Sequence, residues 1–88
     1  MSYELLQLPH AMRQLHQLRK THNPRHNEII KAISALAENP RPAASEKLVG
    51  RSERRVRIGE YRVIYRIDDE KRAITVIAVA HLREVYKR

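Results

Sequence analysis

The sequence predicts an α+β fold in which a helical hairpin packs on a small antiparallel β-sheet. Apolar residues recur with the 3.6-residue period of helices in the first half, and alternate with the two-residue period of strands in the second half. The length of 88 residues fits one domain, which we expect to span residues 1–88. The expected order of elements is β-α-α-β-β-β with a short final strand.

A short strand and a helix open the chain. Residues 3–8, Tyr-Glu-Leu-Leu-Gln-Leu, form an apolar run that is typical of a β-strand. Pro9 ends this run and suits the first position of a helix, because its missing N–H would have no partner there. Apolar residues then recur at helical spacing, and we expect this helix to break at residues 21–23.

A second helix follows the break. Asn23 is a favourable N-cap and Pro24 a favourable first helical residue, so this pair marks a helix start. One apolar face then runs from Ile29 to Ala37. Residues 39–42, Asn-Pro-Arg-Pro, end the helix because proline cannot continue its hydrogen-bond ladder. Two helices joined by so short a break predict a helical hairpin.

The second half has the pattern of strands. Apolar residues alternate with charged ones in residues 56–58 and 61–67, and residues 59–60, Gly-Glu, have the composition of a two-residue type II′ hairpin loop. Residues 73–80 are apolar on both faces, which favours a strand in the interior of the sheet. Residues 84–86, Glu-Val-Tyr, are expected to form the short final strand at an edge.

The hairpin register brings basic side chains together. With residues 59–60 as the loop, Arg57 pairs with Arg62, and Arg55 shares their face because side chains alternate along a strand. We call these three residues the arginine face. Like charges directly opposite each other destabilise a sheet. Two interpretations stay open: a solvent-exposed face on which long arginine stems cover apolar neighbours, or a phosphate-binding face.

The composition favours a polyanionic partner and excludes several kinds of site. The net charge is +8, and all six basic residues between positions 51 and 66 are arginine, which favours bidentate phosphate contacts. The absence of Cys excludes disulfides, thiol catalysis and cysteine-based metal sites. His22 and His26 have a metal-compatible spacing, but no third ligand is evident, so we expect no metal and no cofactor.

The apolar runs are too short for a membrane helix. The run of residues 73–80 is far shorter than the roughly twenty residues that such a helix needs. The first residues, Met-Ser-Tyr-Glu, lack the basic and apolar regions of a secretory signal. We therefore expect a cytoplasmic location and no membrane partner.

Two segments resemble motifs of the RelE/ParE superfamily of toxin–antitoxin toxins. Residues 59–65, Gly-Glu-Tyr-Arg-Val-Ile-Tyr, are similar to its hairpin motif, and residues 80–87, Ala-His-Leu-Arg-Glu-Val-Tyr-Lys, to its C-terminal motif. A Lys-Leu-Val-Gly segment at residues 47–50 precedes the hairpin, as it does in that family. The sequence departs from the pattern at Ala80, where Gly is usual, and at Leu82, where an Arg is frequent. The resemblance covers nearly the whole chain and implies a RelE-like fold.

The resemblance also implies a function, with the RelE-like branch favoured. It implies a toxin of a type II toxin–antitoxin system, a ribosome-dependent endoribonuclease that cuts messenger RNA, inhibits translation and is neutralised by an antitoxin. The partners so implied are the antitoxin, the ribosome and mRNA, and operator DNA through the toxin–antitoxin complex. Two alternatives stay open: a ParE-like inhibitor of DNA gyrase, and a non-catalytic RNA- or ribosome-binding module.

The resemblance carries site residues onto this sequence. Its catalytic set of basic residues and a tyrosine corresponds here to Arg55, Arg57, Arg62, Arg83 and Tyr86. RNA can be cut without a metal when a 2′-hydroxyl attacks the adjacent phosphate, which requires a base, an acid and stabilisation of charge. His81 is a further acid–base candidate, against the interpretation of a surface histidine. The residues expected to bind RNA are Arg51, Arg54, Arg66 and Lys87.

Overall fold

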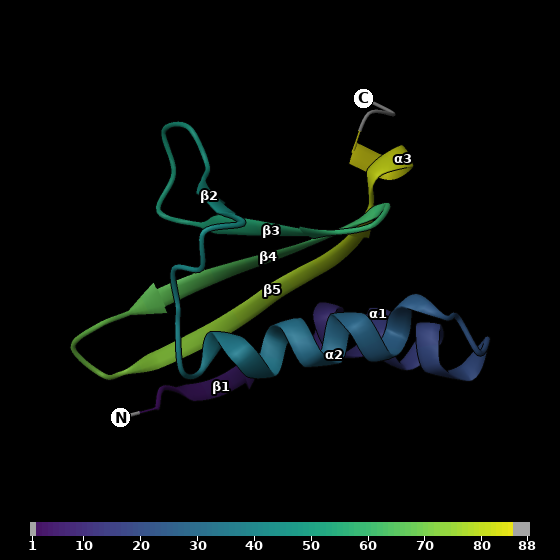
Figure 1. The fold of residues 1–88 in the computed structure, drawn as a ribbon, viewed down its shortest axis with the longest axis horizontal. Coiled ribbons are helices and arrows are strands. Elements are labelled where there is room, and N and C mark those ends of the chain that lie inside the picture. The colour runs from purple at the N-terminus through teal and green to yellow at the C-terminus, as the bar shows by residue number, and fades with distance from the viewer. Residues whose placement is uncertain (1, 86–88) are drawn as a thin grey trace.

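The computed structural model describes residues 2–85, in which two helices lie on one side of a five-stranded sheet (Figure 1). The α+β class and the helical hairpin are therefore confirmed. None of the described helices is long and apolar enough to cross a membrane. The elements in chain order are β1 (Glu4–Gln7), α1 (Pro9–Lys20), α2 (Arg25–Leu36), β2 (Ser45–Lys47), β3 (Arg54–Ile58), β4 (Tyr61–Asp68), β5 (Ala73–His81) and α3 (Leu82–Val85).

The sheet is mixed and not antiparallel throughout, because one of its strand pairs is parallel. The strand order is β1-β5-β4-β3-β2. Strand β1 pairs with β5 in parallel, with Leu6 opposite Thr75, whereas every other pair is antiparallel. The two helices carry the chain from β1 across the sheet to β2, and the strands then return to β1 through three antiparallel connections. Strand β5 is an interior strand, as its apolar faces predict.

Two further elements differ from the sequence-based expectation. Strand β2, with only three residues, has too little sequence for any period to show, and it pairs with β3. The predicted final strand is wrong, because residues 82–85 form the short helix α3, and Tyr86 lies outside the described residues. The last pair of the β4–β5 ladder joins Tyr61 and His81. The next backbone N–H, that of Leu82, donates to the carbonyl oxygen of Glu60 at 2.8 Å. Glu60 belongs to the hairpin loop, so β4 offers β5 no further residue to pair with at this point.

The β3–β4 hairpin has the predicted register. Arg57 lies opposite Arg62, and Gly59 has φ 58°, while Glu60 has no positive φ, which is the φ pattern of a type II′ loop. The loop also contacts α2, because Arg25 Nε donates to Glu60 Oε1 at 2.8 Å. A Cβ added at Gly59 would come within 2.6 Å of the Arg25 guanidinium. Glycine is thus favoured here by both backbone conformation and close approach.

The core lies between the two helices and the sheet. The predicted start of α1 at Pro9 is confirmed, and Asn23 Oδ1 accepts a hydrogen bond from the backbone N–H of Arg25 at 2.8 Å, near the start of α2. The fully buried Tyr65 donates its hydroxyl to the carbonyl oxygen of Pro40 at 2.8 Å, which fixes the connection after α2. The remaining buried core residues are Ala11, Leu15, Leu18, Ile29, Ile33, Leu36, Val56, Val63, Ile74, Val76 and Val79.

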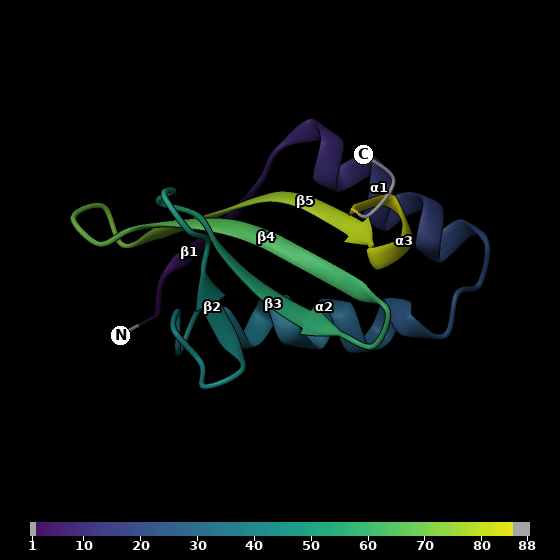
Figure 2. The same cartoon turned by 90° about the horizontal axis from the view of Figure 1, so that it is seen from above.

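Helix α1 covers the edge of β5 beyond the end of β1 (Figure 2). There Gln14 Oε1 accepts a hydrogen bond from the backbone N–H of Val79 at 2.8 Å. A side chain thus replaces the missing strand and satisfies a backbone donor that would otherwise be costly to leave unpaired. This contact fixes the position of α1 relative to the end of the sheet.

Candidate functional site

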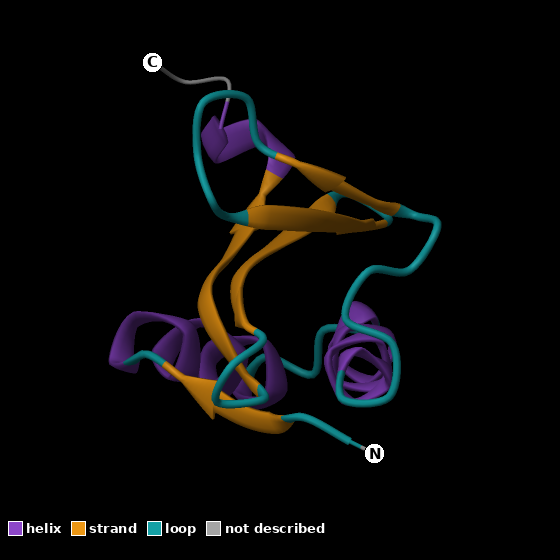
Figure 3. Ribbon diagram, turned by 90° about the vertical axis from the view of Figure 1, so that its left-hand side faces the viewer, coloured by secondary structure: helices purple, strands orange, loops and turns teal. Residues whose placement is uncertain are grey.

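The arginine face lies on the side of the sheet away from α1 and α2. In the ladders Arg57 is opposite Arg62, and Arg55 is opposite both Glu46 and Ile64. The alternate residues Val56 and Val63 are buried against the helices, so the predicted division of the two faces is confirmed. The β2–β3 connection and α3 rise on the same side of the sheet, opposite the two long helices (Figure 3).

The three arginines are held in different ways. Arg55 Nη2 contacts Glu46 Oε2 at 2.7 Å, and Arg57 Nε donates to the carbonyl oxygen of Gly59 at 3.0 Å. The side chain of Arg62 makes no hydrogen bond or ion pair with any residue that the structure describes, and its Nε is buried. A buried donor without a partner is costly. Arg62 is therefore the cation of this face whose binding capacity is unused.

A hollow of about 620 Å³ lies beside Arg62, and we call it the arginine hollow. Arg51, Arg55 and Arg62 line it, with His10 and Gln14 from α1 at its border. Its apolar lining comes from Leu48, Val49, Ile64, Ala78 and Ala80. No acidic residue lines it, but Arg51 and Arg55 are ion-paired with carboxylates that lie outside it. Among the described residues, the unpaired positive charge of the hollow is therefore that of Arg62. Such a surface suits a phosphate backbone better than a neutral small molecule.

The residues expected to bind RNA do not all reach this hollow. Arg51 lines it but also pairs with Glu53 at 2.9 Å, and Arg66 contacts the same carboxylate at 3.4 Å outside the hollow. Burial of Glu53 opposes its ionisation, but its own backbone N–H, Arg51 and Arg66 together hold the pKa of Glu53 below its usual value. Arg54 points to the opposite face, where its Nη2 donates to the buried Ser45 Oγ at 2.9 Å. Lys87 lies outside the described residues.

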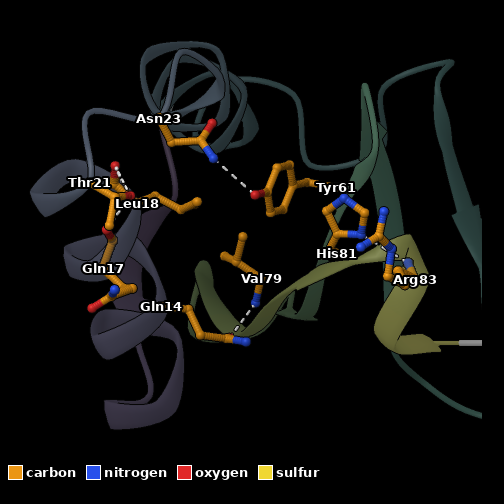
Figure 4. A pocket seen from close by; sticks show the side chains of 9 residues that line it. All are labelled: Gln14, Gln17, Leu18, Thr21, Asn23, Tyr61, Val79, His81 and Arg83. Atoms are coloured by element: carbon orange, nitrogen blue, oxygen red, sulfur yellow. Dashed lines mark hydrogen bonds between the residues drawn. The ribbon is translucent and has the colours of Figure 1, made fainter. Parts of the chain in front are cut away.

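The expected catalytic set is divided between the two faces of the sheet. His81 is paired with Tyr61 on the helix side, and the two rings meet edge-on with centroids 5.1 Å apart. The backbone N–H of Arg83 donates to His81 Nδ1 at 3.0 Å. His81 and Arg83 line a separate hollow of about 450 Å³, which we call the second hollow (Figure 4). Neither residue lines the arginine hollow, and Tyr86 lies outside the described residues.

Sequence reasoning missed two residues that the fold places by the arginine face. Glu46 lies opposite Arg55 on β2, which is too short to be predicted. His10 stands on the first turn of α1 and lines the arginine hollow. Its position after Pro9 gave no sequence signal, because the crossover that brings α1 beside β5 is a tertiary feature.

The chemistry available here is that of cations with a carboxylate and an imidazole. Guanidinium groups bind phosphate and stabilise charge that develops on it, while a carboxylate and an imidazole transfer protons. Within residues 2–85, no three His, Asp or Glu side chains gather as metal ligands would. On one face of the sheet, the described residues thus bring guanidinium groups near a carboxylate and an imidazole.

Comparison with protein families finds one matching family. The model of the ParE toxin of the type II toxin–antitoxin system parDE matches residues 5–86. A search of curated protein sequences finds no match.

Several solved structures are similar over nearly the whole chain. A chain of the toxin–antitoxin complex RelBE2 from Mycobacterium tuberculosis is 27% identical with a TM-score of 0.76, and the match covers 92% of this chain and 99% of that one. The free E. coli toxin RelE, as a mutant, is 28% identical with a TM-score of 0.74, covering 98% and 92%. A chain of the intact E. coli RelBE toxin–antitoxin complex is 26% identical with a TM-score of 0.75, covering 91% and 96%.

Proposed function

Because the chain belongs to the ParE toxin family of type II toxin–antitoxin systems, within the RelE/ParE superfamily, we propose that it is a toxin that cuts messenger RNA on the ribosome. The single observation that carries this proposal is Arg62. Its buried Nε has no partner among the described residues, and it borders a hollow that is lined by three arginines and no carboxylate. Cleavage of mRNA inhibits translation, and a cognate antitoxin neutralises the toxin.

The arginines act on the phosphate of the scissile bond. Attack by the 2′-hydroxyl adds a fifth oxygen to phosphorus and concentrates negative charge on the non-bridging oxygens. Arg62 binds these oxygens, and Arg55, fixed by Glu46, adds a second guanidinium on the same side. Fixed donors of this kind stabilise the transition state because they need no reorganisation during the reaction. Arg57 positions the hairpin loop through its bond to Gly59.

Glu46 and His10 carry the protons. Glu46 is held at 2.7 Å from Arg55 and shares a neighbouring hollow with Arg55 and Arg62. An ionised carboxylate accepts a proton, so Glu46 is the base for the 2′-hydroxyl. His10 lines the hollow, and histidine is the most frequent proton-transfer residue in enzymes, so His10 is the acid for the leaving 5′-oxygen. The reaction gives a 2′,3′-cyclic phosphate and a 5′-hydroxyl, which balances atoms and protons without a metal or cofactor.

The partners follow from this chemistry and from the family. Among the similar solved structures are toxin–antitoxin complexes, which supports an antitoxin as the protein partner. An antitoxin neutralises the toxin by covering the arginine hollow, and the complex of the two binds operator DNA. The other partners are the ribosome and its mRNA, which is the substrate. Because both are in the cytoplasm, we expect the toxin to act there.

Inhibition of DNA gyrase is the second candidate function, favoured by the ParE name of the matching family. Expression in bacteria separates the candidates when transcripts are mapped and DNA breaks are scored for the wild type, Arg62→Ala and the control Arg13→Ala. Arg13 is exposed on α1 and lines neither hollow. Cut transcripts that disappear only in Arg62→Ala support the ribonuclease. Intact transcripts with DNA breaks support gyrase inhibition. The absence of both cut transcripts and DNA breaks supports a non-catalytic binding module.

A further inference from the structure

The second hollow lies where α1, the hairpin loop and the end of β5 meet (Figure 4). Its apolar lining comes from Leu18 and Val79, and Tyr61 with His81 adds two ring edges. Tyr61 is fixed by Asn23, whose Nδ2 donates to the tyrosine hydroxyl at 3.0 Å. The hollow therefore combines an apolar surface with polar groups that are already oriented, as ligand sites commonly do.

The free groups of this hollow are mainly donors. Arg83 is exposed, and its guanidinium has no partner among the described side chains. His81 accepts at Nδ1, so its neutral form carries the proton on Nε2 and donates from there. Gln17 adds an amide at the rim. No carboxylate lines this hollow, and the nearby Glu60 is engaged by Arg25. The arrangement suits a ligand with both a negative charge and a flat, partly apolar group.

The two hollows adjoin each other around the edge of β5. Gln14 lines both of them, and its side chain is anchored to Val79. The neighbouring positions Ala80 and His81 point to opposite faces, so one lines the arginine hollow and the other the second hollow. Because α1 covers the edge of β5 there, a chain of nucleotides that reaches from the arginine hollow to the second hollow has to pass over Gln14.

We propose that the second hollow binds a nucleotide of the RNA strand that flanks the cleaved phosphate, an inference that rests on the proposed ribonuclease function. Arg83 binds the phosphate of this flanking nucleotide, and its base lies against Leu18, Val79 and the Tyr61 ring. His81 and Arg83 act in substrate binding on this face of the sheet, since they lie away from the arginine hollow where the bond is cut. The hollow thus extends the footprint of the toxin on RNA.

Binding of RNA of two lengths tests this inference. The probes are fluorescein-labelled, 2′-O-methylated oligoribonucleotides of two and six nucleotides, which cannot be cleaved, with fluorescence anisotropy as the readout. The six-nucleotide probe should bind the wild type about tenfold more tightly than the short one, a gain within the range of one stacked, phosphate-bound nucleotide. Arg83→Ala should lose most of this gain, whereas the matched control Arg13→Ala should keep it.

A second pair of variants separates a local effect in the hollow from effects of misfolding or of altered net charge. Gln17→Glu places a carboxylate at the rim of the hollow, and Gln7→Glu makes the same change on an exposed residue of β1 that lines neither hollow. Only Gln17→Glu should weaken the long probe. The inference would be overturned if Gln17→Glu and Gln7→Glu bound the long probe equally well and Arg83→Ala bound it as well as Arg13→Ala. It would also be overturned if the hollow variants lost antitoxin binding but kept RNA affinity. Failure of the ribonuclease proposal is distinct, because Arg62→Ala would then bind both probes like the wild type.

Discussion

Arg57 and Arg62 lie directly opposite each other across the β3–β4 ladder, on the face of the sheet away from the helices. Arg57 bonds to the loop carbonyl of Gly59, whereas Arg62 has no partner in the described part of the chain. Two opposed cations repel each other and destabilise a sheet. Binding of a phosphate between or beside them relieves this repulsion. We therefore expect the arrangement to lower the stability of the free protein and to raise its affinity for a polyanion.

Salt should weaken RNA binding steeply. Each phosphate contact releases counterions, which for single strands contributes about 0.7 to the slope of log K against log salt. Arg55→Ala and Arg62→Ala should each flatten that slope by roughly this amount. Titrations of a non-cleavable RNA from low to high salt measure it, with Arg13→Ala as the control. Variants whose slopes equal that of the control would show that these arginines do not touch phosphates.

Loss of the proton-transfer groups should slow cleavage without abolishing binding. Glu46→Gln and His10→Ala should each reduce the rate by about 10²–10⁴-fold, the usual contribution of a positioned acid or base. The control His16→Ala changes an exposed histidine of the same helix that lines neither hollow. A cleavage rate of His10→Ala equal to that of His16→Ala would remove His10 from the mechanism.

Gly59→Ala should destabilise the protein more than Gly50→Ala. Both glycines have a positive φ, of 58° and 70°, so each alanine costs about 1–2 kcal/mol of backbone strain. A Cβ at Gly50 meets nothing within 4 Å, whereas one at Gly59 meets the Arg25 guanidinium at 2.6 Å and displaces it from Glu60. Urea unfolding of the two variants measures the difference. An equal loss of free energy of unfolding would mean that the close approach of Arg25 contributes nothing.

Asp69 should stabilise the fold at neutral pH and not in acid. Arg41 contacts its Oδ2 at 2.9 Å and the Tyr3 hydroxyl donates to its Oδ1 at 2.7 Å. These two hydrogen bonds hold the pKa of Asp69 below its ordinary value of 3.8. A lowered folded pKa gives stability that is present above the ordinary value and lost as the pH falls through the folded one.

Thermal unfolding of Asp69→Asn against pH measures this effect. The variant should melt below the wild type at pH 7 by a small margin, because the groups are exposed, and the two curves should converge in acid. The control Glu70→Gln changes a neighbouring exposed carboxylate and should follow the wild type. If the difference in melting temperature between Asp69→Asn and the wild type grew in acid, the effect of pH would be opposite to the one expected.

The hairpin could be predicted from the sequence in full. Its register depends only on a two-residue loop beginning with glycine and on the alternation of side chains, both of which are local. The division into a buried face with Val63 and a basic face with Arg62 then follows. The same alternation, continued one residue before Arg55, would have placed Arg54 on the buried side.

The rest of the site depends on pairings that are distant in sequence. The sequence pattern does not show that β1 pairs in parallel with β5. Strand β2 has only three residues, too few for a two-residue period to be recognised. Glu46 reaches Arg55 only because β2 adds to the sheet edge, and His10 reaches the arginine hollow only because α1 lies against β5. His81 was grouped with the arginines by its motif, but its register partner is Tyr61, on the other face.

The rate of mRNA cleavage on purified translating ribosomes tests the central role of Arg62 most directly. Wild type and Arg13→Ala should cut the mRNA at equal rates, and Arg62→Ala should be slower by about 10²–10³-fold, as expected for loss of one donor to the transition state. Melting temperatures of the three proteins show whether folding is intact. Cleavage by Arg62→Ala at the rate of Arg13→Ala, or intact mRNA with the wild type, would contradict the assignment of the arginine hollow as a ribonuclease site.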